Sequence, residues 1–176
     1  MSSVQKGSQR AVISEIFKKL SNDDVLLRLL YYLPENDEND DGTCHHFPPL
    51  SDLNPPIKDS GIHTSVVEES IRTSTKSTDI EEKAICRLYI YAGRRRSVFN
   101  NYLLASQEIV IDIFVHESFD KDMRLSWISD RINELIALER VEGSIGKLDY
   151  VAGNSRMAPI GYSKYENIYE YTTDKK

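Results

Sequence analysis

The clearest pattern of apolar and polar positions in this chain runs from Gln107 to Arg140. In its first part, β-branched side chains occupy every second position: Ile109, Ile111, Ile113 and Val115. Glu108, Asp112 and His116 fall on the opposite face. A two-residue period with β-branched residues on one side predicts a β-strand that buries that side.

An amphipathic helix is predicted directly after this strand. Asp120 suits the N-cap, and Asp122 adds a negative charge near the free amides of the first turn. Apolar residues then recur at three- and four-residue steps: Leu125, Ile128, Ile132, Leu135 and Ile136. The other face is polar and carries Arg124, Asp130, Arg131, Asn133 and Glu134. We expect the apolar stripe to lie on a sheet and the helix to stop at Val141–Gly143.

The remaining periodic segments complete an α+β fold. Two helical segments lie between Arg10 and Leu33, with a break and new N-cap at Ser21–Asp24, before Pro34. Strands are predicted at 84–91, 146–151 and 165–172, in addition to 107–116. The 84–91 and 107–116 strands are expected to form an antiparallel hairpin. The prediction is a mainly antiparallel four-stranded sheet with one long helix packed across it.

Residues 35–83 differ in character from the segments on either side. They contain an acidic run, four of the six prolines and a Ser/Thr-rich stretch, with little apolar periodicity. Such a composition predicts a long loop or extended arm. We therefore divide the chain into an N-terminal helical segment (1–34), an arm (35–83) and an α+β core (84–173). The arm is expected to be disordered or to become ordered on another chain.

Composition excludes some classes of protein. The chain has 176 residues, 28% of them charged, and a formal net charge of -6. This is a soluble globular composition, and its acidity argues against a protein that coats nucleic acid. No apolar run approaches the ~20 residues that span a bilayer. With no secretory signal pattern at the start, we expect no membrane association and a cytoplasmic location. Cys44 and Cys86 do not make a disulfide framework, and Cys86 is expected in the core.

Two stretches resemble metal sites but lack ligands. Asp37–Gly42 matches the first half of a calcium loop, but Pro48 stands where the loop needs its bidentate glutamate. Cys44, His45 and His46 lie together, yet only His63 could join them within a folded arm. The prediction is no metal and no cofactor.

Catalytic patterns are also missing. There is no glycine-rich phosphate loop, nucleophile elbow or His-Glu-x-x-His helix. His116 and Glu117 could form an acid–base or metal cluster with Asp120 and Asp122, but caps explain these aspartates more simply. The run Arg94–Arg96 is suited to contact either phosphate or an acidic partner. A nucleic-acid-binding protein or a metal-dependent phosphoryl-transfer enzyme therefore stays as an alternative.

Two runs of residues carry a family resemblance. Val110–His116 (VIDIFVH) and Phe119–Ile136 (FDKDMRLSWISDRINELI) resemble the neck proteins of tailed bacteriophages. Within that group they are most similar to the tail-completion or tail-terminator type, with head–tail connector proteins as near relatives. The order of elements agrees, as do the strand with its arginine tip (85–96) and the loop at 158–162. The resemblance covers residues 84–172, and the N-terminal helices more loosely.

The resemblance implies a structural virion protein that forms a ring, a hexamer or dodecamer, at the head–tail junction. Its partners would be connector or adaptor proteins and tail-tube proteins, with packaged DNA in the channel and no small-molecule substrate. It would reside in the virion neck, and in the host cytoplasm during assembly. The alternative within this class is a head–tail adaptor or stopper that retains DNA. Candidate interface or channel residues are Arg94, Arg95, Arg96, Asp120, Asp122, Arg124 and Arg131.

Overall fold

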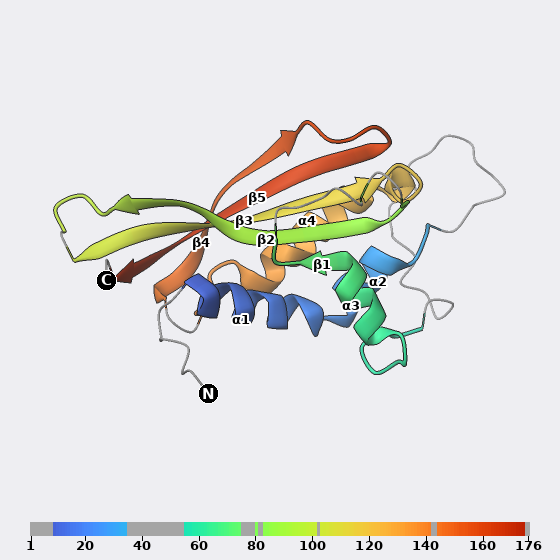
Figure 1. Cartoon of the computed structure of the whole chain (residues 1–176), viewed down its shortest axis with the longest axis horizontal. Helices are drawn as coiled ribbons and strands as arrows, with labels where there is room; N and C mark the ends of the chain where they lie inside the picture. Colours follow the sequence, from blue (N-terminus) through green and yellow to red (C-terminus); the bar gives the residue numbers. More distant parts are fainter. Residues whose placement is uncertain are drawn as a thin grey trace.

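The computed structural model describes residues 9–34, 55–74, 80, 83–101, 103–141 and 144–174. Helices cover one face of a five-stranded sheet (Figure 1). In chain order the elements are α1 (Gln9–Ser21), α2 (Asp24–Tyr31), α3 (His63–Ser70), β1 (Ile71–Arg72), β2 (Cys86–Ser97), β3 (Leu104–His116), the 3-10 helix η2 (Asp120–Asp122), α4 (Arg124–Ile136), β4 (Ile145–Arg156) and β5 (Tyr162–Asp174).

The sheet has the strand order β1-β2-β3-β5-β4. Only β1 runs parallel to its neighbour, and every other pair is antiparallel. The predicted α+β class is therefore confirmed, as is the β2–β3 hairpin. The four predicted strands are all present, and β1 is an additional strand that the sequence pattern did not indicate.

The main core lies between the sheet and its helices. On β3, the four alternating residues from Ile109 to Val115 are fully buried, and Leu88 and Ile90 of β2 pair with that face. The helix α4 turns its own stripe, Ile128, Ile132 and Ile136, into the same cluster. The two periods, two residues in the strand and about 3.6 in the helix, thus meet in one apolar layer.

The opposite face of the sheet carries no helix among the described residues. Tyr89 and Phe114 pack there edge to face, with ring centroids 5.5 Å apart, and Ile80 joins them. Glu108 and Asp112 lie on this face, as their alternation with the isoleucines predicts, and both are buried. Carboxylates at such depth need partners, which neighbouring strands supply.

Two predicted boundaries are wrong. The helix α4 begins at Arg124 instead of Asp120, because Met123 adopts a left-handed backbone conformation (φ 58°) that separates it from η2. It also ends at Ile136, because Leu138 is left-handed as well (φ 61°) and its amide bonds the carbonyl of Leu148. The apolar period of α4 is as predicted, but the left-handed residues at its two ends make the helix shorter than predicted.

Strand β2 extends beyond the predicted 84–91 strand and includes Arg94–Arg96. The strand continues to Ser97, because Arg95, Arg96 and Ser97 pair with residues of β3. A β-bulge between Ala92 and Arg95 lets the pairing resume. Strand β4 likewise extends to Arg156, beyond the predicted 146–151 strand.

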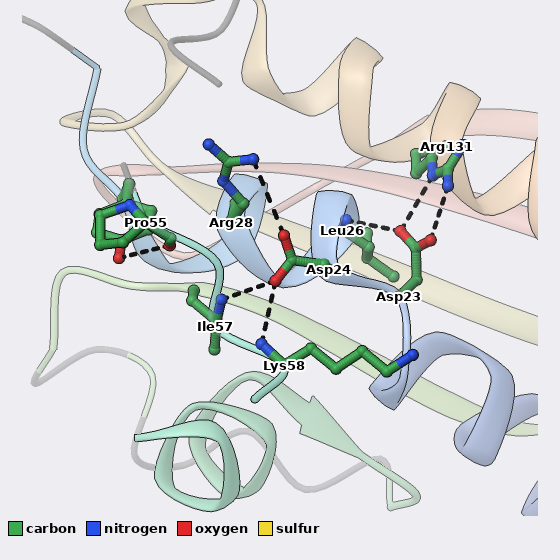
Figure 2. Close-up of polar contacts among 9 residues, drawn as sticks. Asp23, Asp24, Leu26, Arg28, Pro55, Ile57, Lys58 and Arg131 are labelled. Carbon is green, nitrogen blue, oxygen red and sulfur yellow. Dashed lines mark hydrogen bonds and ion pairs between the residues drawn. The ribbon is translucent and has the colours of Figure 1, made fainter. Parts of the chain in front are cut away.

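The predicted loop over residues 35–83 is wrong for residues 63–72, which form α3 and β1. Ile57, Val66 and Ile71 are buried in the main core, so these few apolar residues suffice to fix the segment. Asp24 of α2 accepts hydrogen bonds from the amides of Ile57 and Lys58, at 2.7 and 3.0 Å (Figure 2). Residues 35–54 and 75–79 lie outside the described chain, and the three-part division of the chain stays a prediction.

We predict that Gly93→Ala lowers the free energy of unfolding by about 1–3 kcal/mol. A Cβ at this position would lie 2.9 Å from both the Glu108 Cβ and the Val110 Cγ2, so the bulge would have to move. Gly61→Ala is the matched control, because a Cβ there meets nothing within 4 Å. Urea denaturation of both variants measures the difference, and equal stabilities would contradict the assigned bulge.

Candidate assembly surfaces

Arg94, Arg95 and Arg96 are all exposed near the free end of the β2–β3 hairpin (Figure 1). Arg96 Nη2 lies 2.5 Å from Glu108 Oε1, and Arg95 Nη2 donates to the carbonyl oxygen of Asp174 at 2.7 Å. The Arg94 side chain has no hydrogen-bond or ion-pair partner within the described chain. We call these three residues the basic edge. Contacts among the described residues neutralise their positive charge only in part.

A row of carboxylates crosses the helix-free face on the next strands. Glu108 of β3 pairs with Glu170 of β5, and Glu170 pairs with Asp149 of β4. Glu108 is compensated by Arg96, but no basic partner for Glu170 or Asp149 occurs among the described residues. Like charges directly opposite each other destabilise a sheet. Glu170 and Asp149, which we call the acidic edge, are therefore suited to contact a basic group of another chain.

A second group of polar residues on this face forms ion pairs and hydrogen bonds within the group. Lys164 Nζ lies 2.7 Å from Asp112 Oδ2, and the Tyr91 hydroxyl donates to the same oxygen at 3.1 Å. Burial and the neighbouring Asp112 carboxylate raise the pKa of Tyr91, so this phenol remains a hydrogen-bond donor. Arg156 Nη2 pairs with Glu166 at 2.8 Å. We assign this group to stabilisation of the sheet.

Both long hairpins end in exposed apolar side chains. Phe99 is 89% exposed in the β2–β3 connection, and Met157 is 98% exposed in the β4–β5 connection. Leu103 and Ile160 are exposed beside them. The two connections lie at opposite ends of the sheet, because β3 ends at His116, which pairs with Tyr162 at the start of β5 (Figure 1). The sheet therefore carries exposed apolar side chains at both of its ends.

Asp122 and Arg124, predicted as interface residues, are instead buried inside the molecule. Arg124 Nη2 lies 2.7 Å from Asp122 Oδ2, and the two side chains are 1% and 5% exposed. Arg124 Nη1 also donates to the backbone oxygens of Leu29 and Tyr32, each at 2.7 Å. The guanidinium therefore caps the C-terminal end of α2, so neither residue is available to a partner.

Arg131 holds the other end of the same helix. Its Nε and Nη2 donate to the two carboxylate oxygens of Asp23 at 3.0 and 2.7 Å (Figure 2). Asp23 is also the N-cap of α2, accepting from the amide of Leu26 at 2.8 Å. The hydrogen bonds between Arg131 and the Asp23 carboxylate raise the pKa of Arg131 above its usual value. Arg124 and Arg131 stand two helical turns apart, about 10 Å, which matches the length of α2.

The proposed acid–base or metal cluster around His116 does not form. The His116 ring contacts the Ser118 hydroxyl at 2.8 Å, and Asp120 accepts from the amide of Leu125 at 3.2 Å. Among the described residues, no group of three or more His, Cys, Asp and Glu side chains could hold a metal ion. His63 Nε2 lies 2.9 Å from the carbonyl oxygen of Ser21. The calcium-like loop and Cys44–His46 fall outside the described chain.

The acidic edge was not among the residues singled out from the sequence. Asp149 and Glu170 lie in different predicted strands, and only the pairing of β4 with β5 brings them together. Cys86 was predicted correctly as a core residue, and burial raises the pKa of its thiol. In the described parts of the chain, no helix is both long and apolar enough to cross a bilayer.

Comparison with known proteins adds an assignment by family. The family model described as YomW matches residues 23–171. This range includes the contacts of Arg124 and Arg131 with the two ends of α2, which we call the clamps, and the whole sheet except for the last residues of β5. The chain belongs to the YomW family. No curated protein matches this YomW-family chain.

A solved structure shares the fold of this YomW-family chain. It is a chain of "Virion of native gene transfer agent (GTA) particle", with a TM-score of 0.51 and 10% sequence identity. The alignment covers 94% of this chain and 96% of that chain. At this identity the likeness establishes a common fold over nearly the full length of both chains.

We predict that Arg124→Met lowers the free energy of unfolding by about 3–5 kcal/mol, because Asp122 would be left buried without its partner. The carbonyl groups of Leu29 and Tyr32 would also lose a donor. Arg140→Met is the control, since Arg140 is an exposed arginine beyond the end of α4. Chemical denaturation monitored by Trp127 fluorescence measures both, and similar stabilities would refute the buried clamp.

Proposed function

We propose that this YomW-family protein is a structural component of a phage-type virion and forms a ring at the head–tail junction. The observation that carries the proposal is the fold shared, over 94% of the chain, with a chain of a gene transfer agent virion. The resemblance of residues 110–136 to phage neck proteins supports the same role. In this proposal the chain has no catalytic role and takes no cofactor.

Within that class we propose the role of tail terminator or tail-completion protein. The residue runs 110–116 and 119–136 resemble this type more than the connector type. A terminator must contact the end of the tail tube on one side and the connector on the other. The exposed tips at Phe99 and Met157, at opposite ends of the sheet, provide two apolar surfaces suited to such contacts. A head–tail adaptor or stopper is the alternative within the same class.

A ring of six or twelve copies fits this role, since closed rings join one surface of each subunit to a different surface of the next. The basic edge and the hairpin tips are suited to contacts with other copies, with adaptor and tail-tube proteins, or with DNA in the channel. Among the candidate residues from the sequence, Arg94, Arg95 and Arg96 remain in this proposal. Asp120, Asp122, Arg124 and Arg131 act within the chain.

Electron microscopy of lysates from particles lacking this protein tests the role. We expect DNA-filled heads beside free, abnormally long tails, because nothing would stop tail-tube polymerisation. Heads that have lost DNA beside tails of normal length would instead identify an adaptor or stopper. Normal, joined particles would refute a neck function altogether. Restoring the wild-type protein from a plasmid is the control for effects on neighbouring genes.

A nuclease assay with magnesium or manganese separates the structural role from the enzymatic alternative. We expect no cleavage of single- or double-stranded DNA by the purified full chain. The physical reason is that the described residues hold no group of three or more His, Cys, Asp and Glu side chains that could bind a metal ion. Metal-dependent cleavage that co-purifies with the protein would refute the proposal.

A further inference from the structure

We propose that neighbouring copies in the ring join edge to edge, so that the outer half of β2 in one copy pairs with β4 of the next. The basic edge of one copy then meets the acidic edge of its neighbour. This inference rests on the proposed ring and specifies the contact that builds it.

Each edge of the sheet has an open stretch within the described chain. The short strand β1 pairs only with Leu88 and Tyr89, which leaves β2 from Ile90 to Ser97 without an outer neighbour. Strand β4 is the last strand at the other side, and the backbone of its Leu148 already bonds Leu138 and Glu139, so its open stretch begins at Asp149. Edge strands present unpaired amide and carbonyl groups that can pair with another chain. The two open stretches are therefore suited to contact each other between copies.

The strand directions allow this contact without any change in the sheet. Strands β2, β3, β5 and β4 alternate in direction, so β2 and β4 run opposite ways. Placing β2 of one copy beside β4 of the next continues the alternation as an antiparallel pair, the more stable kind. The contact joins two different surfaces, so it is heterologous and can close into a ring.

Charge selects this pairing over the symmetric ones. Two β2 edges would bring arginines together, and two β4 edges would bring Asp149 and Glu170 together, so both symmetric dimers are repulsive. Only the β2–β4 contact places opposite charges across the joint. Both edges also carry a bulge next to these residues, which disfavours indiscriminate strand pairing.

The charges also stand at the same level of the sheet. The bulge that contains Arg94 lies opposite Glu108, and its amide donates to Glu108 Oε2 at 3.1 Å. Glu108 is in one cross-strand row with Glu170 and Asp149. Copies in a closed ring are related by rotation alone. With the strands along the ring axis, Arg94 of one copy meets Asp149 of the next.

Apolar surface lies beside the charges on the β4 edge. Tyr150 and Val151 directly follow Asp149 and are 43% and 51% exposed. The centre of a protein interface is depleted of charged residues and enriched in tyrosine, with a polar rim around it. The β4 edge therefore offers both the apolar area and the specific charge that an intersubunit joint requires.

Charge reversal on each edge tests the contact. In particles lacking the chromosomal copy, Arg94→Glu or Asp149→Lys supplied alone should lower incorporation of the protein and infectious titre by at least about tenfold, since like charges would meet. Both substitutions in one chain should restore the titre. Co-expression of the two single variants should also restore it, because they can alternate around a ring. Neither side chain has a hydrogen-bond or ion-pair partner among the described residues, so folding should be unchanged.

Lys58→Glu and Asp59→Lys are the matched controls, because they reverse exposed charges in the segment that leads to α3, outside both edges. Full incorporation of the single variants would overturn the edge contact and leave the virion role intact. Loss that neither the double variant nor co-expression rescues would also overturn it. If the Arg94→Glu chain additionally lost DNA binding in a gel shift, the arginine would be assigned to DNA instead. Absence of the wild-type protein from purified particles would refute the proposed function itself.

Discussion

The fold depends on how α4 holds α2. Arg124 and Arg131 extend from one side of α4, two turns apart, and bind the C-terminal and N-terminal ends of α2. A buried guanidinium is costly unless its nitrogens have acceptors, and each nitrogen of Arg124 has one, from Asp122 or from two backbone carbonyls. Asp24 then fixes the backbone at Ile57 and Lys58, so the α2–α4 pair also positions the segment that leads to α3 and β1.

Because all four α-helices contribute to one side or one end of the sheet, the other surfaces are free for different uses. The helix-free face carries an internal polar group around Asp112, while the charges near Glu108 extend to both sheet edges. The described part of the chain provides no counter-ion for Asp149 or Glu170 and no acceptor for the Arg94 side chain. These charges do not stabilise the sheet of a single chain, whereas the proposed assembly that joins the two edges would pair them.

This arrangement suits the proposed role in a virion. Buried hydrogen bonds join α2 to α4, and in that proposal the exposed hairpin tips at opposite ends of the sheet contact partners above and below. The proposed edge contact would supply the lateral joint. The chain belongs to the YomW family and shares its fold with a chain of a gene transfer agent virion.

The sequence by itself determined the α+β class, the four long strands and the apolar stripe of α4, because residue periodicity is a local property. It also indicated the exposed arginines at 94–96. Tertiary structure decided the rest. Arg124 and Arg131 lie on the polar side of their helix, and only the packing of α2 against that side converted them from surface residues into clamps. Residues 63–72 form a helix and a strand because a few apolar side chains reach a distant core. Asp149 and Glu170 became one charged site through strand register, which no local pattern encodes.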